Sequence, residues 1–123
     1  MFKQVKAEIT ERIEETTVEE KIERKCKEYG IDPDIPLAIA KLETGHFTSR
    51  AYIEGNNVGG LSVDEVPMEF DSLDAGIEAF VQNLAENYFA QGLDTVEEIG
   101  KKYCPVNEEH WVNIVNQLVK EYE

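Results

Sequence analysis

Apolar residues recur every three or four positions along most of the chain, which is the period of an amphipathic α-helix. The clearest case is residues 72–88. A further stretch, residues 35–45, is almost wholly apolar and long enough for a core helix. The pattern predicts helices over residues 1–15, 17–30, 35–45, 72–88, 95–103 and 107–122.

Residue types that begin and end helices support these boundaries. A capping box pairs a Thr with a Glu three positions later. Thr16 with Glu19 or Thr17 with Glu20 fits at one helix start, and Thr95 with Glu98 fits at another. Asp71 or Ser72 can cap the helix over residues 72–88, and Asn107 can cap the helix over residues 107–122. Gly30 and Pro105 stand where a helix should stop.

The segment between residues 44 and 60 has neither helical nor strand periodicity, and it is rich in Asn and Gly. Long loops of this kind in compact domains are usually functional. Residues 61–68 are short and interrupted by Pro67, so we expect at most an irregular strand or one arm of a hairpin. The predicted fold is mostly α, with five or six helices and a reduced irregular or β lobe.

The length and charge limit the possible functions. A chain of 123 residues is enough for one domain, which we place at residues 18–123, with residues 1–17 as an amphipathic N-terminal helix or arm that a protein partner could bind. The net charge of -14 would repel a nucleic acid backbone. We also expect no membrane span and no secretion signal in this chain.

Cys26 and Cys104 are too few and too far apart in sequence for a disulfide framework or a zinc site. We therefore expect two unpaired thiols, at least one of them buried. No metal and no cofactor is predicted.

The residue with the clearest chemical potential is Glu43. It ends the apolar segment that begins at Ile35, just before Gly45 and the Asn/Gly-rich loop. A carboxyl group on a buried helix that faces an open loop loses hydration, and the loss raises its pKa toward the value that a general acid needs. An ordinary exposed Glu in a last helical turn is the alternative.

Four short motifs, taken in order, resemble the bacterial lysozyme-like peptidoglycan hydrolases. The resemblance is greatest to the family 73 glycoside hydrolases, the endo-β-N-acetylglucosaminidases of autolysins and phage lysins, and it extends to the lytic transglycosylases. The motifs are Tyr29-Gly30-Ile31-Asp32-Pro33, Leu37-Ala38-Ile39-Ala40, Glu43-Thr44-Gly45-His46-Phe47 and Asn56-Asn57-Val58-Gly59-Gly60-Leu61. Phe70-Asp71-Ser72 and Tyr103-Cys104-Pro105 are similar to later landmarks, so the resemblance covers about residues 18–120.

The resemblance implies a lysozyme-like helical domain and a role for several residues. Glu43 matches the catalytic acid, which would protonate the glycosidic oxygen as the C1–O bond breaks. Tyr103 matches a motif tyrosine near the sugar at the cleavage point. Asn57 and Gly60 would belong to the loop that lines the cleft, although tight turns with positive φ explain an Asn-Asn-Gly-Gly sequence equally well. His46 is placed where it could touch substrate.

The chain departs from the family pattern after Leu61, because the lobe that usually carries a second acidic residue is reduced to about ten residues. Glu65 and Glu69 are the candidates, with Asp64 and Asp71 behind them. An inverting hydrolase needs its base about 6.5 to 9.5 Å from the acid, and a retaining one needs its nucleophile at about 5 Å. Without a second carboxylate, the N-acetyl group or the 6-hydroxyl of the substrate would attack C1.

Three functions remain open from the sequence. The leading one is a hydrolase of the glycan strands of peptidoglycan. The alternatives are a lytic transglycosylase with a single catalytic Glu and a silent glycan-binding or assembly module of a phage or mobile element. Without a leader, such an enzyme would reach the wall after export or lysis, or as part of a longer protein.

Trp111 could stack on a sugar, but its helical spacing with Ile114 and Val115 favours a place in the core.

Overall fold

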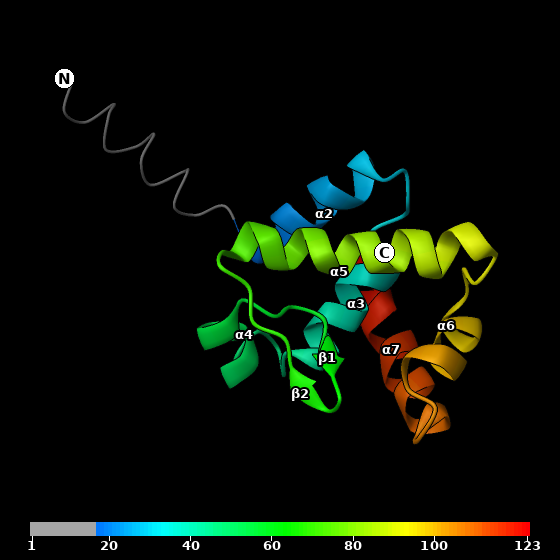
Figure 1. The fold of residues 1–123 in the computed structure, drawn as a ribbon. Coiled ribbons are helices and arrows are strands. Elements are labelled where there is room, and N and C mark those ends of the chain that lie inside the picture. The colour runs from blue at the N-terminus through cyan, green and yellow to red at the C-terminus, as the bar shows by residue number, and fades with distance from the viewer. Residues whose placement is uncertain (1–16) are drawn as a thin grey trace.

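The computed structural model describes residues 17–123, and over this range the chain is a mostly helical domain with one small sheet (Figure 1). The described residues form six α-helices, a short 3₁₀ helix and a two-stranded hairpin. In chain order these are α2 (Val18–Glu28), α3 (Asp34–Glu43), α4 (Arg50–Gly55), β1 (Ser62–Val63), β2 (Val66–Pro67), α5 (Leu73–Asn87), η1 (Phe89–Gln91), α6 (Val96–Tyr103) and α7 (Glu108–Tyr122). The predicted fold class is confirmed.

The predicted N-terminal helix over residues 1–15 lies outside the described residues, and so does the suggested partner contact through it. Thr17 is the N-cap of α2, and its side chain accepts a hydrogen bond from the backbone N–H of Glu20 at 3.1 Å. Of the two alternative capping boxes at this boundary, Thr17 with Glu20 therefore marks the start of α2.

Helix α3 is the centre of the core. Its buried residues run from Pro36 to Ala40, and it packs mainly against α7. Helix α5, in yellow-green, crosses above α3 in Figure 1 and carries Phe80 and Leu84 into the same core. Because α3 is buried along its middle, its last residue, Glu43, is held at a fixed place at the edge of the core.

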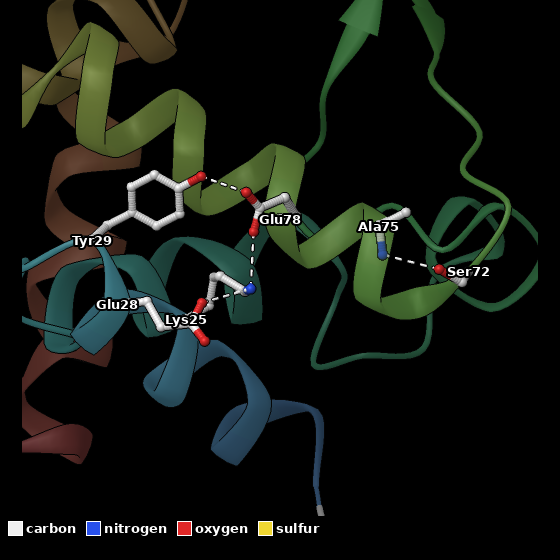
Figure 2. Close-up of polar contacts among 6 residues, drawn as sticks. All are labelled: Lys25, Glu28, Tyr29, Ser72, Ala75 and Glu78. Atoms are coloured by element: carbon white, nitrogen blue, oxygen red, sulfur yellow. Dashed lines mark hydrogen bonds and ion pairs between the residues drawn. The ribbon is translucent and has the colours of Figure 1, made fainter.

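Helix α2 is attached to α5 by a polar cluster at the surface (Figure 2). Lys25 Nζ lies 3.0 Å from a carboxylate oxygen of Glu78 and 2.7 Å from one of Glu28. The Tyr29 hydroxyl donates to the other oxygen of Glu78. These contacts lie at the border of the buried face of α2, on which Ile22 and Cys26 are fully buried.

The segment between residues 44 and 60 is more regular than predicted, because it contains the six-residue helix α4. Ser49 caps this helix by accepting from the backbone N–H of Tyr52 at 3.2 Å. A helix of this length is too short to reveal a period in the sequence. The ring of Tyr52 packs edge-on against Phe47, with 5.6 Å between ring centroids, and this contact supports a helix that local sequence alone would leave marginal.

The reduced β lobe is a tight hairpin. Ser62 pairs with Pro67 and Val63 with Val66, and the two residues between the strands, Asp64 and Glu65, both have positive φ. Two left-handed residues in a row are the geometry of a type I′ turn, whose twist matches that of paired strands. The expectation of a short strand or hairpin arm is confirmed.

The last two helices also begin where their caps predicted. The Thr95 side chain accepts from the backbone N–H of Glu98 at 3.2 Å and donates to its carboxylate at 2.8 Å. Asn107 stands at the cap position of α7, but its side chain makes no capping hydrogen bond. No helix among residues 17–123 has the length and apolar character needed to cross a bilayer.

Candidate active site

Glu43 lies at the end of α3 and is held from two sides. On one side, the indole Nε1 of Trp111 in α7 donates a hydrogen bond to Oε1 of Glu43 at 2.9 Å. On the other side lies Gly60, where an added Cβ would stand only 2.5 Å from Oε2. Three segments far apart in sequence therefore meet at one carboxyl group.

The backbone turns sharply just beyond Glu43. The Thr44 side chain is buried, donates to the carbonyl of Ala40 at 2.7 Å and accepts from the N–H of Phe47 at 2.8 Å. Gly45, His46 and Phe47 follow with φ near +60°, a region that non-glycine residues rarely occupy. This turn ends α3 and leaves Glu43 at its rim, while the side chain of His46 is exposed.

The environment of Glu43 raises its pKa. Partial burial disfavours the charged form and is the larger effect, and the hydrogen bond from Trp111 opposes it by stabilising the carboxylate. The net shift is upward. The structure thus gives Glu43 the property that the sequence analysis expected from its position, a carboxyl group that keeps its proton at higher pH than an exposed Glu.

A cavity of about 300 Å³ opens beside this carboxyl group. It is lined by Leu42, Glu43, Cys104, Asn107, His110, Trp111 and Ile114. A larger hollow of about 560 Å³, at the end of α2, has Tyr29, Asp32 and Asp94 as its ionisable lining residues. We place the site at the smaller cavity, because a partly buried carboxyl group with a raised pKa lines it.

Tyr103, the last residue of α6, contacts both Trp111 and the loop that carries Gly60. Its ring stacks on Trp111 with 5.6 Å between centroids and an interplanar angle of 27°. Its hydroxyl donates to the backbone carbonyl of Gly59. Burial and the nearby charge of Glu43 raise the pKa of Tyr103 well above its usual value, so it stays a neutral donor.

Asn57 organises the loop from within. The side chain is 2% exposed. Its amide nitrogen donates to the carbonyls of Leu61 and Met68, at 2.8 and 3.0 Å, and its oxygen accepts from the N–H groups of Gly59 and Leu61. These four bonds use the hydrogen-bonding capacity of the amide. Asn57 thus shapes the loop that carries Gly60, and the loop approaches so closely that a Cβ on Gly59 would overlap the ring of Phe80.

The two candidates for a second carboxylate lie in or near the hairpin. Glu65 is exposed in the turn between β1 and β2. Glu69 is exposed as well, and its side chain lies against Gly55 at the end of α4. Neither lines the cavity at Glu43. Asp64 and Asp71, the secondary candidates for this carboxylate, are also exposed.

Two features of the site were not predicted. Trp111 is in the core, as its spacing favoured, but it also donates to Glu43; a buried indole N–H needs a partner, and that requirement was the available signal. Cys104 lines the cavity, and burial and the charge of Glu43 raise its pKa.

Both cysteines are free thiols and Cys26 is buried, as predicted. Within residues 17–123, no group of three His, Cys, Asp or Glu side chains is arranged to hold a metal ion.

Comparison with known protein families identifies the family of this domain. Residues 19–123 match the Glucosaminidase family, whose description is mannosyl-glycoprotein endo-beta-N-acetylglucosaminidase. No curated protein sequence matches the chain significantly. The family match covers most of the chain, including every residue of the site. The chain is thus a glycoside hydrolase of the bacterial cell wall, with peptidoglycan as its substrate, and it belongs to the glucosaminidase family, family 73 of the glycoside hydrolases.

Proposed function

We propose that this enzyme cuts peptidoglycan strands as an endo-β-N-acetylglucosaminidase, with Glu43 as its general acid. The observation that carries the proposal is the setting of the Glu43 carboxyl group, which is partly buried, fixed by Trp111 at 2.9 Å and adjacent to an open cavity. A general acid must hold a proton at the working pH and release it to the leaving group. Burial raises the pKa of Glu43 in the direction that this role requires.

In the proposed reaction, a glycan strand lies along the site with a glycosidic oxygen at the Glu43 carboxyl. Glu43 donates its proton to that oxygen as the C1–O bond breaks, and positive charge develops on the sugar ring. The carboxylate left behind is stabilised by the Trp111 N–H. The loss of a proton therefore does not leave an unpaired charge at this partly buried position.

We assign Tyr103 and the loop over residues 57–60 to the substrate-binding part of the site. The Tyr103 hydroxyl already donates to Gly59, so its role is to hold this loop beside Glu43. Gly60 would face the sugar with its exposed backbone. His46, exposed just beyond α3, is the proposed polar contact at the edge of the site, and Asn57 acts indirectly by shaping the loop.

Glu65 is our candidate for the second carboxylate. The hairpin begins two residues after Gly60, which contacts Glu43, so the lobe starts directly at the acid. Five residues of chain keep the backbone of Glu65 within about 17 Å of Gly60. An exposed carboxylate on a short hairpin can activate a water molecule once substrate fills the site. Glu69 is the weaker candidate because its side chain packs toward α4.

One observation favours a second candidate function. Among residues 17–123, no hydrogen bond joins Glu43 to another carboxyl group, and Glu65 is exposed away from the cavity lining. A single-acid route, in which the 6-hydroxyl of the substrate attacks C1, would need no such partner. That route is lytic transglycosylase chemistry, and it yields an anhydro sugar.

The products distinguish these functions. We expect purified peptidoglycan treated with the enzyme to give fragments with reducing N-acetylglucosamine ends, identified by mass spectrometry after borohydride reduction. Glu43→Gln should form them at least about 10²-fold more slowly. Anhydro-muramoyl ends would establish the transglycosylase instead. Equal activity in the wild type and in Glu43→Gln would remove Glu43 from the reaction.

A further inference from the structure

The partner of the Trp111 indole N–H is unusual for a core tryptophan. The side chain is 4% exposed and lies in the first half of α7, among residues that pack on α3 and α6. A buried indole N–H needs an acceptor, and any backbone carbonyl would satisfy it. Here the acceptor is Oε1 of Glu43, 68 residues earlier in the chain. This hydrogen bond links the core residue Trp111 to the proposed acid.

The hydrogen bond makes the two carboxyl oxygens unequal. In the protonated form, the carbonyl oxygen accepts hydrogen bonds better than the hydroxyl oxygen does, and the hydroxyl carries the proton. Because Oε1 accepts from Trp111, the proton is favoured on Oε2. This is the oxygen that faces Gly60, where an added Cβ would come within 2.5 Å. The proton is thus directed away from α7 and toward the loop.

We propose that Trp111 is the positioning residue of the acid: its indole N–H fixes the Glu43 carboxyl group and directs the acidic proton to Oε2, on the side of Gly60. This inference rests on the proposed function of Glu43 as general acid. Trp111 does not touch the reacting bond in this role and acts through Glu43 alone.

Trp111 is itself well fixed, as a positioning residue must be. Its ring stacks on Tyr103, and Tyr103 stands in turn against Tyr88 with 5.7 Å between ring centroids. The same Tyr103 holds Gly59 through its hydroxyl. One aromatic stack therefore contacts both the carboxyl group and the loop that faces it.

The other titratable groups around Glu43 are Tyr103 and Cys104 at the end of α6 and His110 on α7. The pKa values of Tyr103 and Cys104 are raised, so both are neutral where a Glu titrates. His110 is the remaining ionisable side chain that lines the cavity. His110→Gln is therefore the matched control for any effect assigned to Trp111.

The chain has a single tryptophan, so its fluorescence reports on the surroundings of Trp111. We expect the emission of the wild type to titrate with the Glu43 carboxyl group, at a pH above the usual range for Glu, and the titration to be absent in Glu43→Gln. His110→Gln should keep it. An emission that does not change with pH in the wild type, or changes equally in Glu43→Gln, would overturn the inference without any measurement of activity.

Activity provides the second test. Trp111→Phe keeps an aromatic ring but removes the N–H. We expect kcat to fall about tenfold with little change in KM, and the alkaline limb of kcat/KM to move to higher pH, because the carboxylate loses its donor. A fall in kcat with an unmoved limb would reduce Trp111 to a packing residue. If Glu43→Gln is fully active while the fluorescence titration is present, the contact stands and the proposed function fails.

Discussion

Glu43 and Glu78 are two carboxyl groups that accept hydrogen bonds from aromatic side chains, yet their pKa values move in opposite directions. At the α2–α5 surface, the Tyr29 hydroxyl and Lys25 hold the pKa of Glu78 below its usual value (Figure 2). At the end of α3, burial raises the pKa of Glu43 even though Trp111 donates to it. The difference is solvent and charge: Glu78 loses little hydration and lies beside the cation Lys25, whereas Glu43 is partly buried and its hydrogen-bond donor is a neutral indole.

This comparison separates a structural carboxylate from a candidate acid better than residue type does. A lowered pKa means that a group stays ionised and supports an ion pair. A raised pKa in a cavity means that the group holds a proton that it can give away. Glu43→Gln should therefore lower activity, whereas Glu78→Gln should affect only stability.

The largest effect is expected from Glu43→Gln compared with Glu78→Gln. Loss of the general acid should lower the rate of glycan cleavage by about 10² to 10⁴, with the fold retained because Gln can still accept from Trp111. Glu78→Gln should leave cleavage within about twofold and lower stability by less than about 1 kcal/mol, since its ion pair with Lys25 is partly exposed. Release of reducing ends and thermal unfolding measure the two quantities. The comparison fails if Glu78→Gln is the less active enzyme.

The exposed hairpin carboxylates give the next largest effect. If Glu65 activates water, Glu65→Gln should slow hydrolysis by about 10²-fold, whereas Glu69→Gln, whose side chain lies against α4, should not change the rate. The same peptidoglycan assay measures both. Unchanged rates in both variants, together with anhydro products, would favour the single-acid route.

Gly60→Ala tests the packing that surrounds Glu43. Gly60 has φ +68°, and a Cβ there would collide with Oε2 of Glu43, so we expect at least about a tenfold loss of kcat from displacement of the acid. Gly92→Ala is the matched control, because Gly92 has φ +82° with no atom near the added Cβ. Both variants should lose about 1 to 2 kcal/mol of stability from the left-handed backbone. Equal activity in the two variants would contradict the contact at Glu43.

The smallest effect is the pH dependence of stability, and its sign should differ between the two carboxyl groups. The folded-state pKa of Glu43 is raised, so as the pH rises through the usual Glu value the unfolded chain ionises first, and the wild type loses stability relative to Glu43→Gln until the folded pKa is passed. The folded-state pKa of Glu78 is lowered, so its contribution is present above the usual Glu value and is lost as the pH falls through the folded pKa.

Urea unfolding of the wild type and both variants across about pH 3 to 8 measures these slopes. The difference between wild type and Glu43→Gln should fall with rising pH, and the difference between wild type and Glu78→Gln should rise. High salt should weaken the second effect more than the first, because exposed charges are screened. Slopes of the same sign would show that the two environments do not differ as described.

The sequence by itself determined the local features of this protein. Thr17 and Thr95 marked helix starts, because their side chains accept hydrogen bonds from N–H groups within the same turn. The apolar run before Glu43 predicted a buried helix with a carboxyl group at its end, and the ordered motifs indicated the family. Helix α4 escaped detection because six residues are too few to establish a period.

Only the tertiary structure decided what surrounds Glu43. The partners of the site are 68 residues apart for Glu43 and Trp111 and 44 residues apart for Tyr103 and Gly59. No local pattern encodes such pairings, because they depend on how α3, α6 and α7 pack. Spacing alone assigned Trp111 to the core, and packing made it a hydrogen-bond donor to the proposed acid. The direction in which the pKa of Glu43 moves is set in the same way, since burial and charge are properties of the assembled fold.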